Sequence, residues 1–455
     1  MDRPPLSQKL MLYYAAPHLT HAVATLPVAL FVPAFYADDL GLPLAGVGLA
    51  IAASRATDMV TDPLVGILSD RFKTSWGRRK PWIALGTPLL MLSAWMVFAP
   101  AGQVSLLYLF VWASLLFLGF TLVDLPHKAW GAELSTDYTE RTHVAAWREG
   151  SGALGQILFL VVLSAMDFLG YVDNREQLRV IALIIVFSLP PLVTLALVKV
   201  PEFPSEELAG ERHEGWAGLR LVLHNWAFVR TLVTLLLLGT AVLIQATLHR
   251  LVLTHVVGRP EIFATMILAE NLISLAMVPV WMNIANRIGK HRAICLAALW
   301  IGVSSLGFPW VDRGDTGFYA TLIVLRGSSL ASLFMLANSI AADVVDHDIV
   351  ASGRQRTGLF FAVWGIAIKL AVALGVLLGT ALPAAFGFEP SAPAQDPDAK
   401  KWLLIIYGWL PCLIIASGLP LMWNFPIDRV RQRALREQIA ARRTGVFRSD
   451  ADGAA

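Results

Sequence analysis

The sequence predicts an all-α membrane protein of twelve transmembrane helices in two six-helix halves. Three observations predict this fold class: an apolar composition, a regular series of long apolar segments, and a phrase that is repeated in the two halves. Of the 455 residues, 56% are hydrophobic and only 15% are charged, whereas soluble domains have about 25% charged residues. A chain this apolar cannot cover a water-facing surface, so we expect lipid around most of it.

The apolar segments are long enough to cross a bilayer as helices, which takes about 20 residues. Several exceed this minimum, which predicts tilted helices or helices that extend past the bilayer. The segments lie at residues 10–36, 42–68, 81–101, 104–131, 149–171, 179–199, 228–256, 261–285, 291–311, 316–344, 355–387 and 401–424. Their even number places both termini on the same side of the membrane.

The basic residues indicate which side this is. They gather in alternate connections and in the C-terminal tail, and the other connections hold few apart from Arg175, Arg259 and Arg313. The basic connections contain Arg71, Lys73, Arg78, Arg79, Lys80, Arg141, Arg148, Arg287, Lys290, Arg292, Arg354 and Arg356, and the tail contains Arg429, Arg431, Arg433, Arg436, Arg442, Arg443 and Arg448. Because basic residues stay on the cytoplasmic side, this pattern predicts a multi-pass protein of the plasma (inner) membrane with both termini in the cytoplasm.

A repeated phrase divides the chain into two halves. The second span ends in Pro63-x6-Asp70-Arg71, and the eighth span ends in Pro279-x6-Asn286-Arg287. Parallel repeats of six helices are the architecture of the major facilitator fold. We therefore expect an N-terminal half at residues 1–200, a cytoplasmic linker at 201–227, a C-terminal half at 228–426 and a cytoplasmic basic tail at 427–455.

The first copy of the phrase resembles the loop signature of the major facilitator superfamily, Gly-x-Leu-x-Asp-Arg-x-Gly-Arg-Arg. It reads Gly66-Ile-Leu-Ser-Asp70-Arg71 and, after a longer spacer, Gly77-Arg78-Arg79. We expect a latch here, in which Asp70 accepts hydrogen bonds from basic residues or from a neighbouring helix N-terminus. The predicted gating residues are Arg55, Asp70, Arg71, Arg78 and Arg79. Charge that only sets the orientation in the membrane is the alternative, and both roles are compatible.

Charged residues inside the second span point to a cation site. Arg55, Asp58 and Asp62 lie at i, i+3 and i+7 and therefore share one helical face. Two carboxylates that face a cavity suit a cation whose shell is built from oxygen atoms, and Na⁺, Li⁺ and H⁺ all fit. Ionisable residues in a span indicate function because lipid makes them costly. Structural ion pairs inside the bundle are the alternative.

The fourth and eleventh spans add further candidates. Thr121 and Asp124 are three residues apart and share a face, and a proline that follows them can bend the helix and free carbonyl groups. Lys128 and Trp130 come next in the same span. Lys369 is a single cation in the middle of the eleventh span, and the carboxylates of the other half are its candidate partners.

The remaining polar residues carry less information. His18 and His21 are candidates for substrate contact or for packing hydrogen bonds, and no Cys or carboxylate at a diagnostic spacing makes them a metal site. Glu270 is a candidate partner for an arginine such as Arg250 or Arg326. No nucleophile–base arrangement or phosphate-binding Gly loop is present, which disfavours an enzyme and ATP-driven transport. We expect no cofactor besides a coupling ion, no nucleic acid and no obligatory protein partner.

Five stretches together resemble the glycoside–pentoside–hexuronide:cation symporters, the melibiose permease group. They are Arg55-Ala-Thr-Asp58-Met-Val-Thr-Asp62-Pro63; Trp76-Gly-Arg-Arg-Lys80-Pro-Trp82; Thr121 to Asp124-Leu-Pro126; Gly131-Ala-Glu133-Leu with Asp137-Tyr-Thr-Glu140-Arg141-Thr and Arg148; and Asp343-Val-Val-Asp346 through Gly353-Arg-Gln-Arg356 to Lys369. They occur in the family's order over most of the chain. The resemblance implies symport of a sugar, glycoside or uronide with Na⁺ or H⁺ by alternating access.

The resemblance also implies roles for single residues. The cation-binding residues would be Asp58, Asp62, Thr121 and Asp124, and the sugar-binding residues would include Asp124 and Arg148, with Lys369 beside the cation site. To the substrate site we add Lys128, Trp130, His21 and Lys369. No metal is expected beyond Na⁺ at the cation site.

Two departures from the family pattern concern the substrate. Melibiose permeases have an acidic sugar-binding residue in the first span, where this chain has His18-Leu-Thr-His21-Ala22, and Lys128 stands where an aromatic residue is expected. A cationic, His-rich lining suits an anionic substrate such as a uronide. A lysolipid-carrying branch shares the fold and the charges of spans two and eleven, so a lysolipid-like or amphipathic organic anion is the alternative. A proton-driven exporter and a non-transporting receptor or scaffold are the other function classes.

Overall fold

The computed structural model describes residues 6–72, 74–135, 137–203, 220, 222–352, 357–392, 394–427 and 431–432. These residues form helices and short connections, and none of them belongs to a β-strand. The predicted all-α class is therefore confirmed. Most of the predicted linker, most of the predicted basic tail, and the basic residues Lys73, Arg354 and Arg356 lie outside the described residues.

The first half of the chain contains a broken helical segment followed by long helices. In chain order its elements are α1 (Gln8–Ala15), α2 (His18–His21), α3 (Leu26–Leu30), α4 (Val32–Ala34), the π-helix η1 (Phe35–Asp39), α5 (Leu44–Arg71), α6 (Lys80–Phe98), α7 (Leu106–Glu133), α8 (Tyr138–Phe168) and α9 (Asn174–Lys199). Pro17, Pro27 and Pro33 lie at the breaks of the first segment. Proline interrupts a helix because it lacks the N–H group that the next turn requires.

The second half of the chain repeats this order. Its elements are α11 (Trp226–Val252), the π-helix η2 (Leu253–Val257), the 3₁₀ helix η3 (Pro260–Ile262), α12 (Phe263–Ala276), α13 (Val278–Ile288), α14 (Lys290–Ser305), the 3₁₀ helix η4 (Phe308–Trp310), α15 (Thr316–Gly327), α16 (Leu330–Ser352), α17 (Thr357–Ala385) and α18 (Pro397–Trp423). The segment that contains α12 and α13 is bent by 42° where Pro279 opens α13.

The number of spans follows from length and composition. In the part of the chain that is described, nine helical segments are long and apolar enough to cross a bilayer, and two bent pairs bring the number to eleven. The α5 helix has 28 residues, but Arg55, Asp58 and Asp62 make it more polar than the others. The multi-pass membrane class is confirmed, and the number twelve stays a prediction that requires α5 as the twelfth span.

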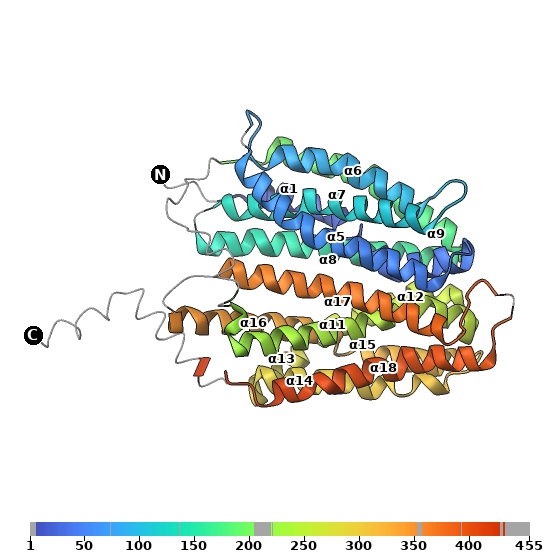
Figure 1. Cartoon of the computed structure of the whole chain (residues 1–455). Coiled ribbons are helices and arrows are strands. Elements are labelled where there is room, and N and C mark those ends of the chain that lie inside the picture. Colours follow the sequence, from blue (N-terminus) through green and yellow to red (C-terminus); the bar gives the residue numbers. More distant parts are fainter. Residues whose placement is uncertain are drawn as a thin grey trace, which may run out of the picture.

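The two halves lie against each other as two layers of roughly parallel helices (Figure 1). The α5 helix packs against α17, α8 packs against α12, and α11 packs against α3 and α4. We call the two ends of the bundle the Asp38 end, where η1 ends, and the Asp70 end, where α5 ends. These contacts place α5 and α17, which carry the predicted cation-site residues, at the interface between the layers.

The hydrophobic core connects the halves at one end of the bundle. One buried cluster contains Phe31 and Phe35 of the first half together with Leu248, Phe263 and other residues of the second half, all toward the Asp38 end. A second buried cluster contains residues of the second half alone. Within the described residues, the two halves therefore share a packed core toward the Asp38 end.

Candidate functional site

Two carboxylates of α5 meet one hydroxyl of α7 between the layers. Thr121 Oγ1 lies 3.0 Å from Asp58 Oδ1 and 2.8 Å from Asp62 Oδ1. Asp58 and Asp62 are four residues apart on α5, which brings them onto one face. The hydroxyl has a single proton and can donate to only one carboxylate at a time. At any moment, therefore, one of the two Oδ1 atoms receives no proton from Thr121.

Two positive side chains balance these carboxylates. Lys369 of α17 places its Nζ 2.9 Å from Asp58 Oδ2 and also contacts Asp62 Oδ2. Arg55 Nη1 lies 3.5 Å from Asp58 Oδ2, and its guanidinium carbon lies 3.6 Å from the ring centre of Phe117. The four charges sum to zero, and Lys369 lies between the two carboxylates.

A second charged cluster lies one turn further along α7. Asp124 Oδ2 lies 2.8 Å from Lys128 Nζ, and Asp124 Oδ1 contacts the guanidinium of Arg148 on α8. Arg148 also contacts Glu149. Asp124 and Arg148 are buried, whereas the side chains of Lys128 and Glu149 are 53% and 68% exposed. This cluster also sums to zero charge.

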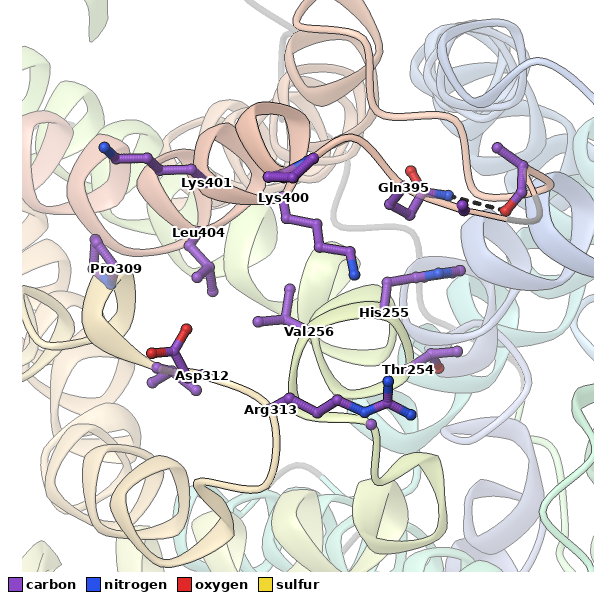
Figure 2. Close-up of a pocket in the computed structure, with 15 residues that line it drawn as sticks. Thr254, His255, Val256, Pro309, Asp312, Arg313, Gln395, Lys400, Lys401 and Leu404 are labelled. Carbon is purple, nitrogen blue, oxygen red and sulfur yellow. Dashed lines mark hydrogen bonds between the residues drawn. The ribbon is translucent and has the colours of Figure 1, made fainter.

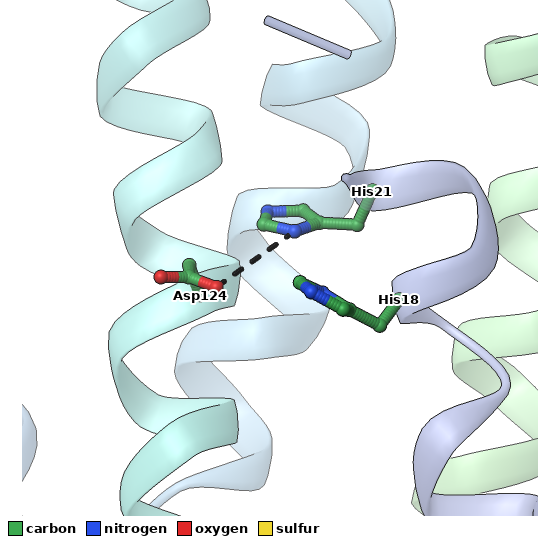
Figure 3. Close-up of side chains that lie close together, drawn as sticks. All are labelled: His18, His21 and Asp124. Atoms are coloured by element: carbon green, nitrogen blue, oxygen red, sulfur yellow. Dashed lines mark ion pairs between the residues drawn. The ribbon is translucent and has the colours of Figure 1, made fainter. Parts of the chain in front are cut away.

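Imidazole rings cover the buried side of this second cluster. His21 Nε2 lies 3.1 Å from the carbonyl oxygen of Phe120 and therefore carries the ring proton. The other nitrogen, Nδ1, is then an acceptor, and it faces Asp124 Oδ1 at 4.0 Å (Figure 3). The buried His18 Nδ1 has no hydrogen-bond partner. The pair of Asp124 Oδ1 and His21 Nδ1 therefore has no donor between its two acceptors, and His18 Nδ1 is a buried polar atom without a partner.

The same three side chains form a cluster with ligand atoms within 4.8 Å of one another, as a metal site would. Spacing along the sequence could not predict this cluster, because Asp124 lies on α7 and the two histidines lie on α2. However, Lys128 and Arg148 already contact both oxygens of Asp124. A divalent ion would add positive charge that no nearby group balances, so the arrangement suits a neutral hydrogen-bond donor better than a metal.

The structure thus divides the predicted site residues between two clusters. Asp58, Asp62, Thr121 and Lys369 contact one another. Asp124 was predicted to share the cation site, but its contacts are with Lys128, Arg148 and His21. Trp130 was predicted to contact substrate, but it is fully buried and its indole N–H donates to the Pro201 carbonyl at 2.9 Å. Trp130 is therefore inaccessible in this conformation.

Three residues of the second cluster were missed by sequence reasoning. His127 accepts at Nδ1 from Arg148 Nε at 3.4 Å and pairs at Nε2 with the Tyr14 carbonyl at 2.8 Å. The Tyr14 hydroxyl donates to the His127 carbonyl at 2.9 Å. The sequence spacing could have indicated His127, because it follows Asp124 by three residues and therefore lies on the same face of α7. Glu149 had no signal beyond its place next to Arg148.

Comparison with known proteins identifies the family. A family of proteins described as MFS/sugar transport protein matches residues 13–429. The chain belongs to this family. It is therefore a multi-pass membrane transporter and not an enzyme.

Curated relatives of the chain are symporters. An uncharacterized symporter of Synechocystis, sll1374, is 25% identical and covers 95% of this chain and 96% of its own length. The human sodium-dependent lysophosphatidylcholine symporter 1 is 24% identical over 87% of this chain and 79% of its own. The putative glycoside/cation symporter YagG of Escherichia coli is 24% identical over 90% of both chains.

A solved structure shares the fold. The D-xylose-proton symporter matches with a TM-score of 0.69 at 14% identity, over 92% of this chain and 97% of that one. The predicted major facilitator fold is confirmed. The resemblance to cation symporters is also confirmed, since the relatives named above are symporters of this superfamily.

In this MFS transporter, the predicted latch joins the ends of three helices. Arg79 Nη2 lies 2.6 Å from Asp70 Oδ1 and 2.8 Å from Glu133 Oε1, and Arg78 lies 2.6 Å from the same Glu133 oxygen. Glu202 accepts the backbone N–H groups of Arg78 and Arg79 at 2.5 and 2.7 Å, which caps the start of α6. Arg71 is exposed. The predicted latch residues Asp70, Arg78 and Arg79 therefore form ion pairs at the Asp70 end of the first half, and their gating role stays a prediction.

At the Asp38 end of the transporter, polar contacts connect the two halves. Arg250 of α11 is buried and donates to Gln177 Oε1 at 3.0 Å and to the Val172 carbonyl at 2.8 Å. Its guanidinium carbon also lies 4.8 Å from the ring centre of Phe263 and 5.2 Å from that of Phe31. Asp38 lies 3.0 Å from His255 Nε2. These contacts join the first half to the second at the Asp38 end.

Proposed function

We propose that this transporter couples the movement of a cation, Na⁺ or H⁺, to symport of a sugar, glycoside or uronide. One observation carries the proposal: the Thr121 hydroxyl lies within hydrogen-bond distance of both carboxylates on α5, and Lys369 of the other half contacts both as well. Oxygen ligands of this kind suit Na⁺ or a proton. Their position between the halves suits a site whose occupancy controls how the halves move.

Lys369 gives the coupling a physical basis. With no coupling ion bound, the Lys369 ammonium and the Arg55 guanidinium together neutralise Asp58 and Asp62, so the empty carrier can reorient without unpaired charge in the membrane. A cation that enters between the carboxylates must displace Lys369, which swings away on its flexible stem. Because Lys369 lies on α17 and the carboxylates lie on α5, this exchange changes the contact between the two halves.

The proposed substrate site is the second cluster. Asp124 and Arg148 offer an acceptor and donors side by side, His21 Nδ1 offers an acceptor that lacks a donor, and His18 Nδ1 is an unpartnered ring nitrogen. Sugar hydroxyl groups both donate and accept, so they match this set. The carboxylate of a uronide would in addition need a positively charged side chain as its partner. Arg148 could be that partner if the exposed Glu149 moved away from it.

We infer that in this conformation the bundle is open toward the Asp70 end and closed at the Asp38 end. The halves are tied at the Asp38 end by Arg250 and His255, whereas Lys128 and Glu149, on the Asp70 side of Asp124, are exposed. The basic connections lie at the Asp70 end, and the positive-inside rule assigns that end to the cytoplasm. The conformation is then the inward-facing one, with both termini in the cytoplasm of a cell whose plasma membrane contains the protein.

The test is uptake into proteoliposomes. A panel of labelled glycosides, hexoses and uronides is offered with an inward gradient of Na⁺ or of H⁺, and we expect one gradient to drive accumulation of one substrate class. Asp58→Asn and Asp62→Asn should abolish the gradient-driven part and leave substrate binding measurable. Asp398→Asn, an exposed carboxylate on α18, is the matched control and should behave as wild type. Accumulation by both variants at the wild-type level would rule out the proposal.

A lysolipid-like substrate is the second candidate. An apolar groove of about 600 Å³ is lined by Leu12, Leu19, Trp147, Leu154 and neighbouring residues of α1, α8 and α9. Trp147 directly precedes Arg148, so an alkyl chain in the groove would place a headgroup near the second cluster. Uptake of labelled lysophosphatidylcholine, alone and in competition with glycosides, decides between the two classes.

A further inference from the structure

A separate pocket lies at the Asp38 end, within the second half of the chain. It has a volume of about 690 Å³ and is formed by the end of η2, the connection between η4 and α15, and the first turn of α18 (Figure 2). This volume is in the range of small-molecule sites, about 300–1,000 Å³. None of the residues of the proposed cation site or of the proposed substrate site lines it.

The pocket has an excess of positive charge. Arg313, Lys400 and Lys401 line it, against the single carboxylate of Asp312. In the described part of the chain, no hydrogen bond or ion pair engages the side chains of these three cations. Figure 2 shows the amino group of Lys400 pointing into the pocket, with the guanidinium of Arg313 on the facing wall. Unpaired cations that converge on one space favour an anion there.

Local structure holds Arg313 in this position. Gly258 ends η2 with φ 75°, and a Cβ built on it would lie 3.4 Å from Arg313 Nε, so the arginine lies over a residue without a side chain. The Gly314 N–H donates to the Val257 carbonyl at 3.0 Å, which ties the arginine's loop to η2. Lys400 lies in the first turn of α18, where the helix dipole adds positive potential.

We propose that this pocket binds a phosphate group, held between Arg313 and Lys400. The planar guanidinium fork of arginine matches the oxygens of a phosphate, and the lysine adds a point charge from the opposite side. Lys401 contributes at longer range. The phosphate is either that of a lipid headgroup at the membrane surface or that of a free phosphate ester. His255 also lines the pocket and pairs with Asp38 of the other half, so the bound anion lies next to a contact that closes this end.

The experiment uses the full chain, purified in detergent without lipid, and has one arm for each source. Inorganic phosphate and glycerol 3-phosphate are titrated by calorimetry against chloride at equal ionic strength. Retention of phosphatidylglycerol compared with phosphatidylcholine is measured by native mass spectrometry. We expect saturable binding in at least one arm, and a loss of about tenfold or more in affinity for Arg313→Gln combined with Lys400→Gln.

Arg259→Gln is the matched control, because Arg259 lies at the same end of the bundle but contacts Glu261 and does not line the pocket. It should bind as wild type. Thermal unfolding of each variant checks that the chain is folded. Binding in neither arm overturns the proposal, and so does a double variant that keeps the wild-type affinity or a control that loses as much as the double variant.

Discussion

At the scale of single residues, the proposed chemistry depends on the balance of charge. Asp58 and Asp62 are balanced by Arg55 and Lys369, and Asp124 and Glu149 are balanced by Lys128 and Arg148. Each cluster is neutral, which makes it tolerable between helices in a membrane. In the proposed mechanism, a charged ligand displaces a side chain from one of these clusters, and this displacement links binding to movement.

Lys369→Gln tests this balance. The change removes the ammonium that lies between Asp58 and Asp62, so these carboxylates should bind Na⁺ more tightly, by about tenfold or more, since a charged hydrogen bond is worth about 1.5–3 kcal/mol. Sodium binding to the purified variant is measured by calorimetry. The tighter binding should slow release and lower the rate of uptake.

Lys128→Gln is the control for this experiment and also tests the role of Asp124. Lys128 pairs with Asp124 alone among the three carboxylates predicted for the cation site. If Asp124 belongs to the second cluster only, the Na⁺ affinity of this variant stays at the wild-type value. Tighter Na⁺ binding in Lys128→Gln would return Asp124 to the cation shell, and unchanged affinity in Lys369→Gln would refute the displacement mechanism.

At the scale of helices, close packing positions the second cluster, which is the proposed substrate site. A Cβ built on Gly155 of α8 would lie only 1.8 Å from the Leu19 carbonyl oxygen of α2, so the two backbones touch there. His18 and His21 are the end residues of that same α2 helix. The contact between α2 and α8 therefore sets the distance between the imidazoles on α2 and Arg148 on α8.

Gly155→Ala should separate α2 from α8. The backbone at Leu19 cannot yield as a flexible side chain would, so we expect a loss of about 1–3 kcal/mol in stability together with weaker substrate binding. Thermal unfolding in detergent measures the first effect. Gly150→Ala on the same helix is the control, because a Cβ there meets nothing within 4 Å. Equal melting temperatures for the two variants would contradict the packing argument.

The latch is a second feature at this scale. Asp70→Asn weakens the ion pair with Arg79, which joins the end of α5 to the start of α6. Because the Asp70 side chain is 59% exposed, such a pair is worth about 0–1 kcal/mol. Substrate affinity should remain unchanged while the transport rate falls by up to about fivefold. Lost binding with a normal rate in the remaining activity would place Asp70 in the site and not in the latch.

At the scale of the whole molecule, the two halves are held together at the Asp38 end. The buried Arg250 donates to Gln177 and Val172 of the first half, and Asp167 of the first half accepts the backbone N–H of Ala264 at 3.0 Å. A membrane surrounds such contacts with little competing water, so they stabilise one conformation. Alternating access requires that they break when the bundle opens at this end.

Arg250→Met should therefore shift the population toward the state that is open at the Asp38 end. The variant keeps most of the side-chain volume and removes two charged hydrogen bonds, so we expect a shift of at least about tenfold. Distances between spin labels at Leu40 and Gly314, measured by pulsed electron resonance, report the opening. Arg259→Gln, whose arginine contacts Glu261 of its own segment, should leave the distance distribution of the parent protein unchanged.

The sequence alone determined the features that depend on local pattern. The apolar segments predicted a membrane bundle, and helical spacing placed Arg55, Asp58 and Asp62 on one face, because both properties arise within a single helix. The division into halves at 200 and 228, and the cytoplasmic position of the termini, stay predictions. The resemblance of five stretches, and no single motif, led to the symporter family.

Only the tertiary structure decided which helices meet. Lys369 lies 307 residues from Asp62, yet the packing of α17 on α5 brings them into contact. Packing also brings Asp124 close to His18 and His21 and buries Trp130 in the core. It places Arg250 of the second half within hydrogen-bond distance of Gln177 in the first half. Spacing within a helix specifies which residues share a face, but the partner across that face depends on how the whole chain packs, and no local pattern in one sequence contains it.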